Sequence, residues 1–293
     1  MRSNSNDSNE LDNVSFTADG IAARRTLMGL PYAQEIYDIL LMQVAGTEAE
    51  TEMQLALLPE NLLFVPFFEA RYRLLDLLMK ATGLTNVLEI AAGLAPRGVV
   101  WTENPDVVYV ELDLPKKSAQ KRVVIETLVD RGQLVARPHL HMVGGDALNA
   151  EDFAHAVAHF KSDEPILIVH EGFLRYITHL QKRILAAHIH TQERRGGYWI
   201  TPDIILSNEP MMRDLRIQAY SNVIHAKLDM DLEANSFESF SEALVFFESL
   251  DCEVEGHFFR EVMADMVSPT LLDLTADDLE KFVWWRMAFV MTL

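Results

Sequence analysis

The stretch that decides the fold is NVLEIAAGLAPRG, residues Asn86–Gly98, an apolar run that breaks into small residues at positions 91–93. A second apolar run, VVYVELDLP, occupies Val107–Pro115 and ends in Glu111 and Asp113. Together they predict a strand, a tight turn, a helix and a second strand that ends in a carboxylate. In doubly wound α/β domains this unit binds a nucleoside, because small residues let the backbone approach the ligand and a carboxylate accepts hydrogen bonds from ribose hydroxyls.

Strands and helices continue to alternate along the chain. The predicted strands are 87–91, 107–112, 139–143, 166–170 and 198–205. The predicted helices between them are 116–131, 151–160 and 180–193. Such alternation implies a parallel sheet with helices on both faces, and two late strands at 253–259 and 285–293 add antiparallel pairing at one edge. We therefore expect an α/β fold with a doubly wound, mostly parallel seven-stranded sheet and an antiparallel edge strand.

The region before the first strand has a different pattern. Apolar residues recur at helical spacing between 16 and 84, and Pro31, Pro59 and Pro66 divide this region into several helices. We expect a helical N-terminal lid at 16–84 and a Rossmann-like domain at 85–293, with a helical insertion near 210–235. The polar residues 1–15 predict a disordered tail.

Composition excludes several classes of function. The 293 residues carry a formal net charge of −19, from 44 acidic and 25 basic residues. Binding to nucleic acid or to anionic membranes needs a basic surface, so this charge argues against both. The single cysteine, Cys252, excludes an internal disulfide and a multi-cysteine zinc site. No apolar run reaches the roughly 18 residues of a membrane span, and the polar N-terminus lacks the apolar stretch of a signal peptide, so we expect a cytoplasmic protein.

Two classes of nucleoside cofactor compete for this pattern. A nicotinamide-dependent dehydrogenase needs G-x-G-x-x-G after the first strand to seat a pyrophosphate on a helix N-terminus. Residues 91–98 read AAGLAPRG, with one early glycine and a proline where the helix should begin, which disfavours a pyrophosphate. S-adenosylmethionine has no phosphate and needs a small residue, a ribose-binding acid and a polar group near the adenine. The chain supplies these in order: Gly93, then Glu111 or Asp113, then Asp146.

Four segments carry a resemblance to a known family. They are LEIAAGLAPRG, YVELDLP, GGDAL and HEGFLRYIT, and they span about residues 86–178 in family order. They resemble the first glycine motif, the E-x-D-x-P segment, the Gly-Asp-Leu segment and the Glu-x-x-Leu-x-Tyr segment of the leucine carboxyl methyltransferase family. This is a family of class I S-adenosylmethionine-dependent methyltransferases, with bacterial relatives that methylate polyketide-type carboxylates. FTADGIAARRTL and EARYRLLDLL resemble its N-terminal lid.

The resemblance implies a set of cofactor-binding residues. They follow the chain from the lid to the fourth strand: Arg25, Arg71, Glu89, Gly93, Glu111, Asp113, Asp146, Ala147 and Glu171. By the resemblance, Gly93 lies under the methionine part of the cofactor. Asp113 binds the ribose, with Glu111 in a structural or secondary role. Asp146 and the Ala147 backbone meet the adenine.

The resemblance also assigns charged residues to the amino-acid end of the cofactor. Glu171 lies at its amino group, and Arg71 pairs with its carboxylate. Arg24 or Arg25 closes the pocket from the lid. The chain departs from the family in the first motif, where AAG replaces the usual G-x-G and Ala91 stands at a glycine position. This departure keeps a second hypothesis open, a binding protein of the same fold without catalysis.

For activity, the resemblance implies O-methyl transfer to a carboxylate of a polyketide-like small molecule or of a peptide. A carboxylate is ionised near neutral pH and needs no general base, whereas a phenol, the alternative acceptor, has a pKa near 10 and benefits from one. His170 and Tyr176 are the candidate catalytic residues. The alternative is that His170 is buried and hydrogen-bonded and that Tyr176 is a packing residue. Candidates to hold an anionic substrate are Arg175, Arg213 and Arg216.

Paired histidines can bind metal, and the chain has two such pairs, His139 with His141 and His188 with His190. No third ligand follows either pair at a fixed spacing. We therefore predict no metal site, and a dehydrogenase is the remaining alternative class of function.

Overall fold

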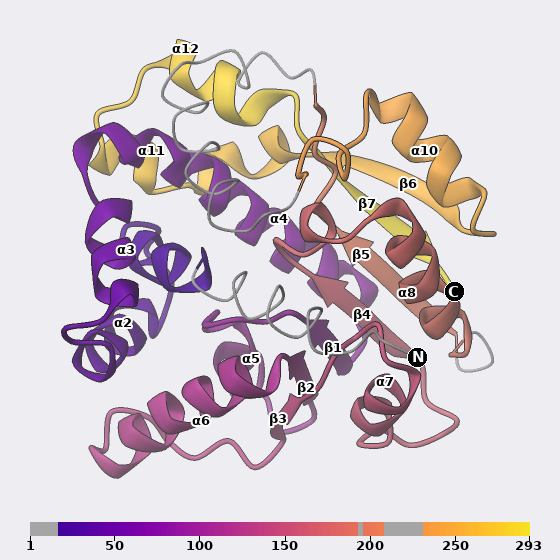
Figure 1. Cartoon of the computed structure of the whole chain (residues 1–293), viewed down its shortest axis with the longest axis horizontal. Helices are drawn as coiled ribbons and strands as arrows, with labels where there is room; N and C mark the ends of the chain where they lie inside the picture. The colour runs from indigo at the N-terminus through magenta and orange to yellow at the C-terminus, as the bar shows by residue number, and fades with distance from the viewer. Residues whose placement is uncertain (1–16, 193–195, 208–230) are drawn as a thin grey trace, which may run out of the picture.

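The computed structural model describes residues 17–192, 196–207 and 231–293. In these residues the strands form a seven-stranded sheet with the order β3-β2-β1-β4-β5-β7-β6 (Figure 1). The strands are β1 (Asn86–Ile90), β2 (Val108–Asp113), β3 (Leu140–Gly144), β4 (Ile166–His170), β5 (Gly197–Thr201), β6 (Glu253–Phe258) and β7 (Met287–Thr292). Strands β1 to β5 pair in parallel, and β7 pairs antiparallel with both β5 and the edge strand β6. The predicted fold class is confirmed.

The apolar runs of the central strands explain their position in the sheet. Every residue of β1 and β4 is buried, as expected for strands that helices cover on both faces. Strand β5 ends at Thr201 rather than at the predicted Ile205, because Pro202 has no backbone N–H to donate to a neighbouring strand.

Helices cover both faces of the sheet. One face packs against α4 (Val65–Thr82), α5 (Arg97–Trp101) and α6 (Pro115–Asp130). The other packs against α7 (Ala150–Val157), α8 (His179–His190) and α10 (Phe240–Glu248). Successive strand residues alternate between the two cores, since Val87 belongs to the first and Leu88 to the second.

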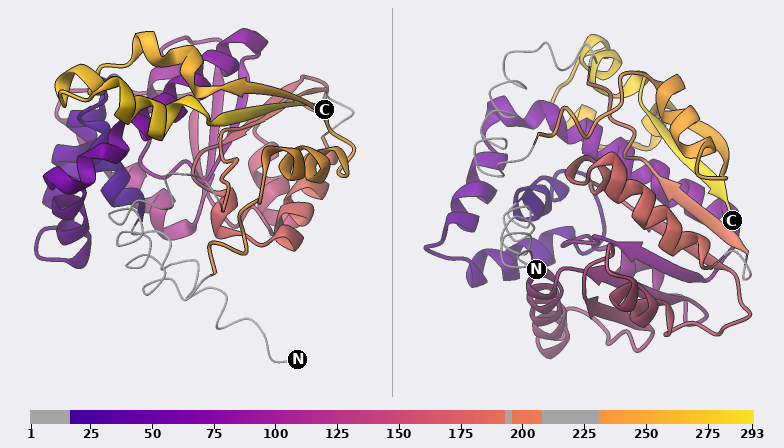
Figure 2. Two further views of the ribbon diagram at one scale, coloured as in Figure 1. Left: turned by 90° about the horizontal axis from the view of Figure 1, so that it is seen from above. Right: turned by 45° about the vertical axis from the view of Figure 1, so that its right-hand side comes forward.

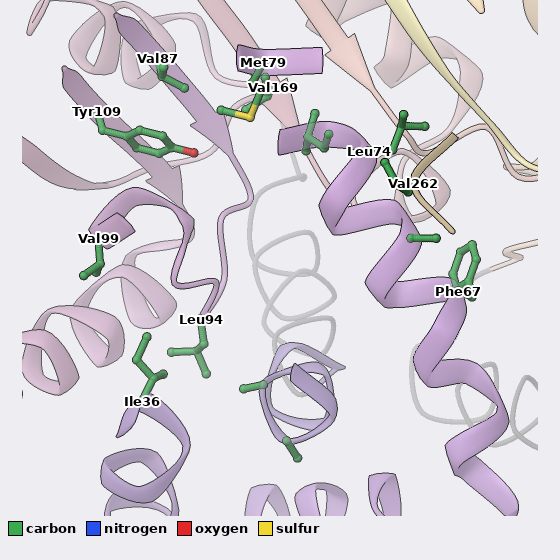
Figure 3. Packing of buried hydrophobic residues seen from close by; sticks show 14 of the residues in the cluster. Ile36, Phe67, Leu74, Met79, Val87, Leu94, Val99, Tyr109, Val169 and Val262 are labelled. Carbon is green, nitrogen blue, oxygen red and sulfur yellow. The ribbon is translucent and has the colours of Figure 1, made fainter. Parts of the chain in front are cut away.

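The N-terminal region is helical in its described part, as predicted. Residues 17–25 are helical, and α2 (Ala33–Gln43), α3 (Glu48–Ala56), the 3-10 helix η1 (Pro59–Phe64) and α4 follow. Helices α2 and α3 lie at one end of the molecule, away from α8 and α10 (Figures 1 and 2). Helix α4 belongs to the main core, because its Leu74 and Met79 share a buried cluster with Val87 of β1 and Val169 of β4 (Figure 3). The N-terminal region is therefore anchored to the sheet through α4.

Short helices complete the described chain. The 3-10 helix η2 (Leu174–Tyr176) follows β4, and four short elements separate β6 from β7: η5 (Phe259–Asp265), α11 (Ser268–Leu271), α12 (Ala276–Leu279) and η6 (Glu280–Trp284). The predicted tail at 1–15 lies outside the described residues, and so does most of the predicted insertion near 210–235, with Arg213 and Arg216. Its described part is 231–235, of which residues 232–235 form turns. Across the described ranges, no helix combines the length and apolarity needed to cross a membrane.

Candidate functional site

A cavity of about 190 Å³ lies at the carboxyl ends of β1 to β4. The strand order reverses between β1 and β4, and ligands of open α/β sheets bind at such a switch point. The predicted site residues that line the cavity are Arg25, Arg71, Gly93, Asp113, Asp146, Ala147, Glu171 and Tyr176. The predicted residues Glu89, Glu111 and His170 lie outside its lining. The cavity is therefore the candidate site. The positions of Glu89, Glu111 and His170 outside its lining are explained by their contacts within the protein.

The turn after β1 forms the floor of the cavity. Ala91 has a φ of 54° and Gly93 a φ of 53°, both in the left-handed region. The Ala91 amide donates to the Leu112 carbonyl at 2.8 Å, which joins the turn to the end of β2. A Cβ at Gly93 would lie 3.4 Å from the Cβ of Ala18, so the glycine leaves room for the N-terminal helix above the turn. Ala91 thus adopts a conformation for which glycine is the ordinary choice.

Asp113 closes this turn from the end of β2. Its Oδ2 accepts a hydrogen bond from the Gly93 amide at 2.6 Å, and its Oδ1 accepts one from the Leu114 amide at 2.7 Å. Burial raises the pKa of Asp113, and the two amides act in the opposite direction. A carboxylate offers about four acceptor sites, so Asp113 retains lone pairs for the hydroxyls of a ligand in the cavity.

The loop after β3 contributes Asp146 and Ala147 to the cavity wall. The Leu148 amide donates to Asp146 Oδ1 at 2.9 Å, and the Asp146 amide donates to Asp152 Oδ2 at 2.8 Å. A Cβ at Gly145 would lie only 2.8 Å from the Cβ of Asp152, so glycine is required where these groups meet. Hydrogen bonds within the loop therefore fix its course.

Glu171, the first residue after β4, is surrounded by three arginines. Its Oε1 accepts from Arg71 Nη2 at 3.1 Å and lies 3.6 Å from Arg25 Nη2. Its Oε2 accepts from Arg97 Nη2 at 2.7 Å. Burial alone would raise the pKa of Glu171, but the three guanidiniums, that of Arg71 foremost, lower it to about 2. Glu171 is thus an anion at neutral pH.

Arg97 links three carboxylates beneath the cavity. Its Nε donates to Asp76 of α4 at 2.7 Å, its Nη1 donates to Glu89, and its Nη2 donates to Glu171. The Tyr109 hydroxyl donates to the second oxygen of Glu89 at 2.8 Å. Both oxygens of Glu89 therefore have partners inside the protein, and Glu89 orients Arg97 rather than facing the cavity.

Glu111 pairs with Glu89 in the register of β1 and β2, behind the cavity lining. Its Oε1 accepts from Lys121 Nζ at 2.7 Å, and its Oε2 has no hydrogen-bond partner among the described residues. Burial, only partly offset by the charge of Lys121, raises the pKa of Glu111 to about 7. Of the two acids at the end of β2, Asp113 is the one that faces the cavity.

His170 is fully buried, and both of its ring nitrogens have partners. Trp199 Nε1 donates to Nε2 at 3.0 Å, and Nδ1 lies 3.1 Å from Asp203 Oδ2. These pairings assign a neutral ring with its proton on Nδ1, since Nε2 acts as an acceptor. The structure thus places His170 as a buried, hydrogen-bonded residue, with no ring nitrogen available to a substrate in the cavity.

Asp203, which the sequence analysis does not single out, holds the loop that follows β4. Its carboxylate accepts from the amides of Gly172 at 2.7 Å and Phe173 at 2.8 Å, and Arg71 Nη1 lies 3.9 Å away. Burial alone would raise the pKa of Asp203, but His170 and the charge of Arg71 hold it well below its usual range. The sequence signal that could have identified Asp203 is an acidic residue just after a buried strand, in the segment ITPD at 200–203.

A second part of the cavity wall is aromatic and cationic. It includes the aromatic residues Phe64, Phe67, Phe68, Phe173 and Tyr176, the cations Arg175 and Arg286, and the aliphatic residues Ile177 and Ile205. The rings of Phe67 and Phe68 lie 5.1 Å apart, and the Arg286 guanidinium lies 4.4 Å from the centre of the Phe67 ring. Phe67 and Phe68 lie in the first turn of α4, and no local sequence signal marks them as lining a cavity, because aromatic residues of an amphipathic helix ordinarily indicate core packing.

The histidines of the two sequence pairs have other contacts. His188 Nδ1 lies 3.0 Å from the Ala147 carbonyl, and the His141 ring stacks on that of His159 with centres 4.5 Å apart. Within the part of the chain that the structure describes, no group of three or more His, Cys, Asp or Glu side chains is arranged to hold a metal ion.

No family model matches the chain, and no curated protein matches it in sequence. Solved structures with a similar arrangement include a protein from Nostoc punctiforme PCC 73102 provisionally described as an O-methyltransferase, with 17% identity over 78% of this chain and a TM-score of 0.49. An O-methyltransferase family protein from Burkholderia thailandensis has 10% identity over 83% of this chain and a TM-score of 0.45. Mitomycin 7-O-methyltransferase MmcR has 12% identity, a TM-score of 0.46, and coverage of 93% of this chain and 71% of its own. The chain spans 60% of the length of the Nostoc protein and 60% of the Burkholderia protein.

Proposed function

We propose that this chain is an S-adenosylmethionine-dependent O-methyltransferase that methylates a carboxylate of a small molecule or peptide. One observation carries the proposal. A single cavity at the switch point is lined, in chain order, by Gly93, Asp113, Asp146 and Glu171, which follow or end strands β1 to β4. These are the positions at which the resemblance to the leucine carboxyl methyltransferase family implies contacts with the cofactor.

The residues present fit this cofactor along its length. Asp113 has lone pairs for the ribose hydroxyls, and Asp146 lines the wall where the adenine would lie. Glu171 is the anion that would pair with the ammonium group, and Arg71 is a cation for the carboxylate. When bound, S-adenosylmethionine supplies a methyl group activated on a sulfonium. The protein then has to align the acceptor with that methyl group and keep water out.

The cavity supports a carboxylate acceptor over a phenol. Its described lining contains no histidine, and His170 is paired on both ring nitrogens. A carboxylate is already ionised near neutral pH, whereas a phenol has a pKa near 10 and needs a base. Tyr176 lines the cavity and is our candidate for contact with the acceptor.

The proposal is tested by measuring binding and turnover separately. Calorimetric titrations with S-adenosylmethionine, S-adenosylhomocysteine and NAD compare the cofactor classes. A panel of carboxylic acids and matched phenols with methyl-labelled cofactor then compares the acceptors. We expect both sulfur compounds to bind, NAD not to bind, and methyl esters to form. Binding without transfer would support the non-catalytic alternative, binding of NAD alone would favour a dehydrogenase, and binding of neither class would refute the cofactor assignment.

Asp113→Ala tests the assignment of the ribose site. We expect it to weaken binding of S-adenosylhomocysteine by about 1.5–3 kcal/mol, roughly 10- to 150-fold, which is the scale of a hydrogen bond to a charged group. Glu111→Gln is the matched control and should leave the affinity unchanged, because Glu111 lies outside the cavity lining. The reverse pattern would transfer the ribose role to Glu111. Thermal unfolding of both variants shows whether the turn itself is preserved.

A further inference from the structure

Arg175 is a cavity-lining cation that the proposed cofactor contacts do not use. It lies in η2 between Leu174 and Tyr176. Three other lining cations have carboxylate partners within 3.6 Å: Arg25 and Arg71 with Glu171, and Lys117 with Asp19. The Nε atom of Arg175, by contrast, is buried and has no hydrogen-bond partner among the described residues.

A buried guanidinium N–H without an acceptor is unfavourable, because it has lost its water and gained nothing in return. A carboxylate ligand corrects this, since the planar guanidinium matches its two oxygens with parallel hydrogen bonds. Arg175 is therefore a cation of the cavity lining with no carboxylate partner among the described residues and with an Nε that lacks an acceptor.

The segment that carries Arg175 is held in place before any ligand arrives. Asn235 Nδ2 donates to the Arg175 carbonyl at 3.2 Å. Buried Lys182 donates through Nζ to the Ile177 and Asn235 carbonyls, at 2.8 and 2.6 Å. The Arg175 guanidinium lies 5.8 Å from the centre of the Tyr176 ring. The backbone that carries this cation therefore loses little conformational freedom when an anion binds.

The other described groups on this part of the wall are mostly apolar. They include Phe64, Phe67, Phe68, Ile177 and Ile205. Arg286 is the second cation of this part of the wall. A mostly apolar wall that also presents cations suits a ligand with an apolar body and an anionic group, because a buried anion needs a paired charge.

We propose that Arg175 binds the carboxylate of the methyl acceptor, and that the acceptors are carboxylic acids with an aromatic or aliphatic body. This rests on the proposed function. One carboxylate oxygen attacks the methyl carbon, and the carbon–sulfur bond breaks with its electron pair left on sulfur. The products are a methyl ester and a thioether, and no proton is transferred. Arg175 orients the attacking group and exchanges no proton.

The test is calorimetric titration of 3-phenylpropionate and decanoate into the protein, with and without S-adenosylhomocysteine. The uncharged amide of each acid is titrated in the same way for comparison. We expect each acid to bind at least 10-fold more tightly than its amide. Arg175→Met should weaken binding of the acids 10- to 100-fold, and Arg175→Lys should restore part of the loss. Affinity for S-adenosylhomocysteine should not change in either variant. In a turnover assay, Arg175→Met should raise KM for the acid far more than it lowers kcat.

Arg183→Met is the matched control, because Arg183 is an exposed arginine on α8 that also lies over an aromatic ring, that of Phe246 at 4.8 Å. It should bind the acids as the wild type does. Equal binding of acids and amides, no binding of either acid, or wild-type binding by Arg175→Met would each overturn the role of Arg175. Failure of S-adenosylhomocysteine to bind would instead overturn the proposed function. The role of Arg175 would still be tested in that case, because the acids and amides are also titrated without S-adenosylhomocysteine.

Discussion

Glu171 and Glu111 are both buried glutamates near the carboxyl ends of strands, yet the structure gives them opposite electrostatic properties. Three arginines surround Glu171 and hold its pKa at about 2. Glu111 has one cation, Lys121, and one oxygen without a partner in the described chain, and its pKa is raised to about 7. Burial acts in the same direction on both carboxyls, so the number of cations within reach decides the outcome.

This difference shows which carboxylate can serve a ligand. Glu171 lines the cavity and is ionised before a ligand arrives, so it can pair with a ligand cation without changing its protonation. Its arginines come from residues 17–25, α4 and α5, which the fold brings together around the end of β4. Glu111 lies behind the cavity and titrates near neutral pH. Of these two glutamates, only Glu171 therefore gives the candidate site a fixed negative charge.

The largest effect is expected for Arg97→Met, which tests whether the arginines around Glu171 stabilise the fold. The change leaves Asp76, Glu89 and Glu171 without a shared cation in a buried site. Removing one partner of a buried ionic network costs about 3–5 kcal/mol, and we expect a loss of that size in the free energy of unfolding. Urea denaturation at pH 7 measures it.

Arg131→Met is the control for Arg97→Met, because Arg131 is exposed and its change should alter the free energy of unfolding by less than about 0.5 kcal/mol. A loss below about 1 kcal/mol for Arg97→Met would contradict the comparison. It would mean that Arg25 and Arg71 compensate Glu171 without Arg97.

The second test uses the opposite pKa shifts of Glu111 and Glu171, which should make the free energy of unfolding depend on pH in opposite directions. The folded pKa of Glu111 is about 7 against an ordinary 4.5, so its contribution is full below pH 4.5 and is lost as the pH rises through 7. Glu111→Gln removes this loss and can still accept from Lys121. Relative to the wild type, the variant should gain about 2–3 kcal/mol in unfolding free energy between pH 5 and pH 8.

Glu171 should affect the free energy of unfolding at acid pH instead. Its folded pKa of about 2 lies below 4.5, so its contribution is full above pH 4.5 and is lost as the pH falls towards 2. Glu111→Gln should therefore leave the acid limb of the unfolding profile unchanged. A variant whose profile runs parallel to that of the wild type from pH 5 to pH 8 would show that Glu111 does not titrate in this range.

The features that the sequence predicts well are those with local signals. Short, largely apolar segments next to turn residues marked β1 to β4, and the cavity-facing residues Gly93, Asp113 and Asp146 follow or end such segments. Parallel strands present their carboxyl ends at one edge, so a residue at the end of a run has a predictable place in space. Strand β5 was shorter than predicted because a proline stops its pairing.

The features that the sequence does not resolve depend on partners distant in the chain. Glu111 and Asp113 lie two residues apart in β2 and have the same residue chemistry, so the pattern left the ribose-binding acid open. Asp113 faces the cavity because it is the last residue of β2, where the chain turns and meets the Gly93 amide. His170 likewise follows the pattern of an active-site residue, and only its pairing with Trp199 and Asp203 shows that its ring is engaged.

The smallest expected effect comes from Ala91→Gly, a substitution that leaves all the charges around Glu171 and Glu111 in place. Ala91 lies between Glu89 and Arg97 in the chain and has a φ of 54°, which costs a residue with a Cβ about 1 kcal/mol. Ala91→Gly should remove that strain and raise the free energy of unfolding by less than about 1 kcal/mol, because the more flexible unfolded chain offsets part of the gain. Ala92→Gly, in the same turn but without a positive φ, should instead lose about 0.5–1 kcal/mol. Equal losses in the two variants would show that Ala91 is not strained.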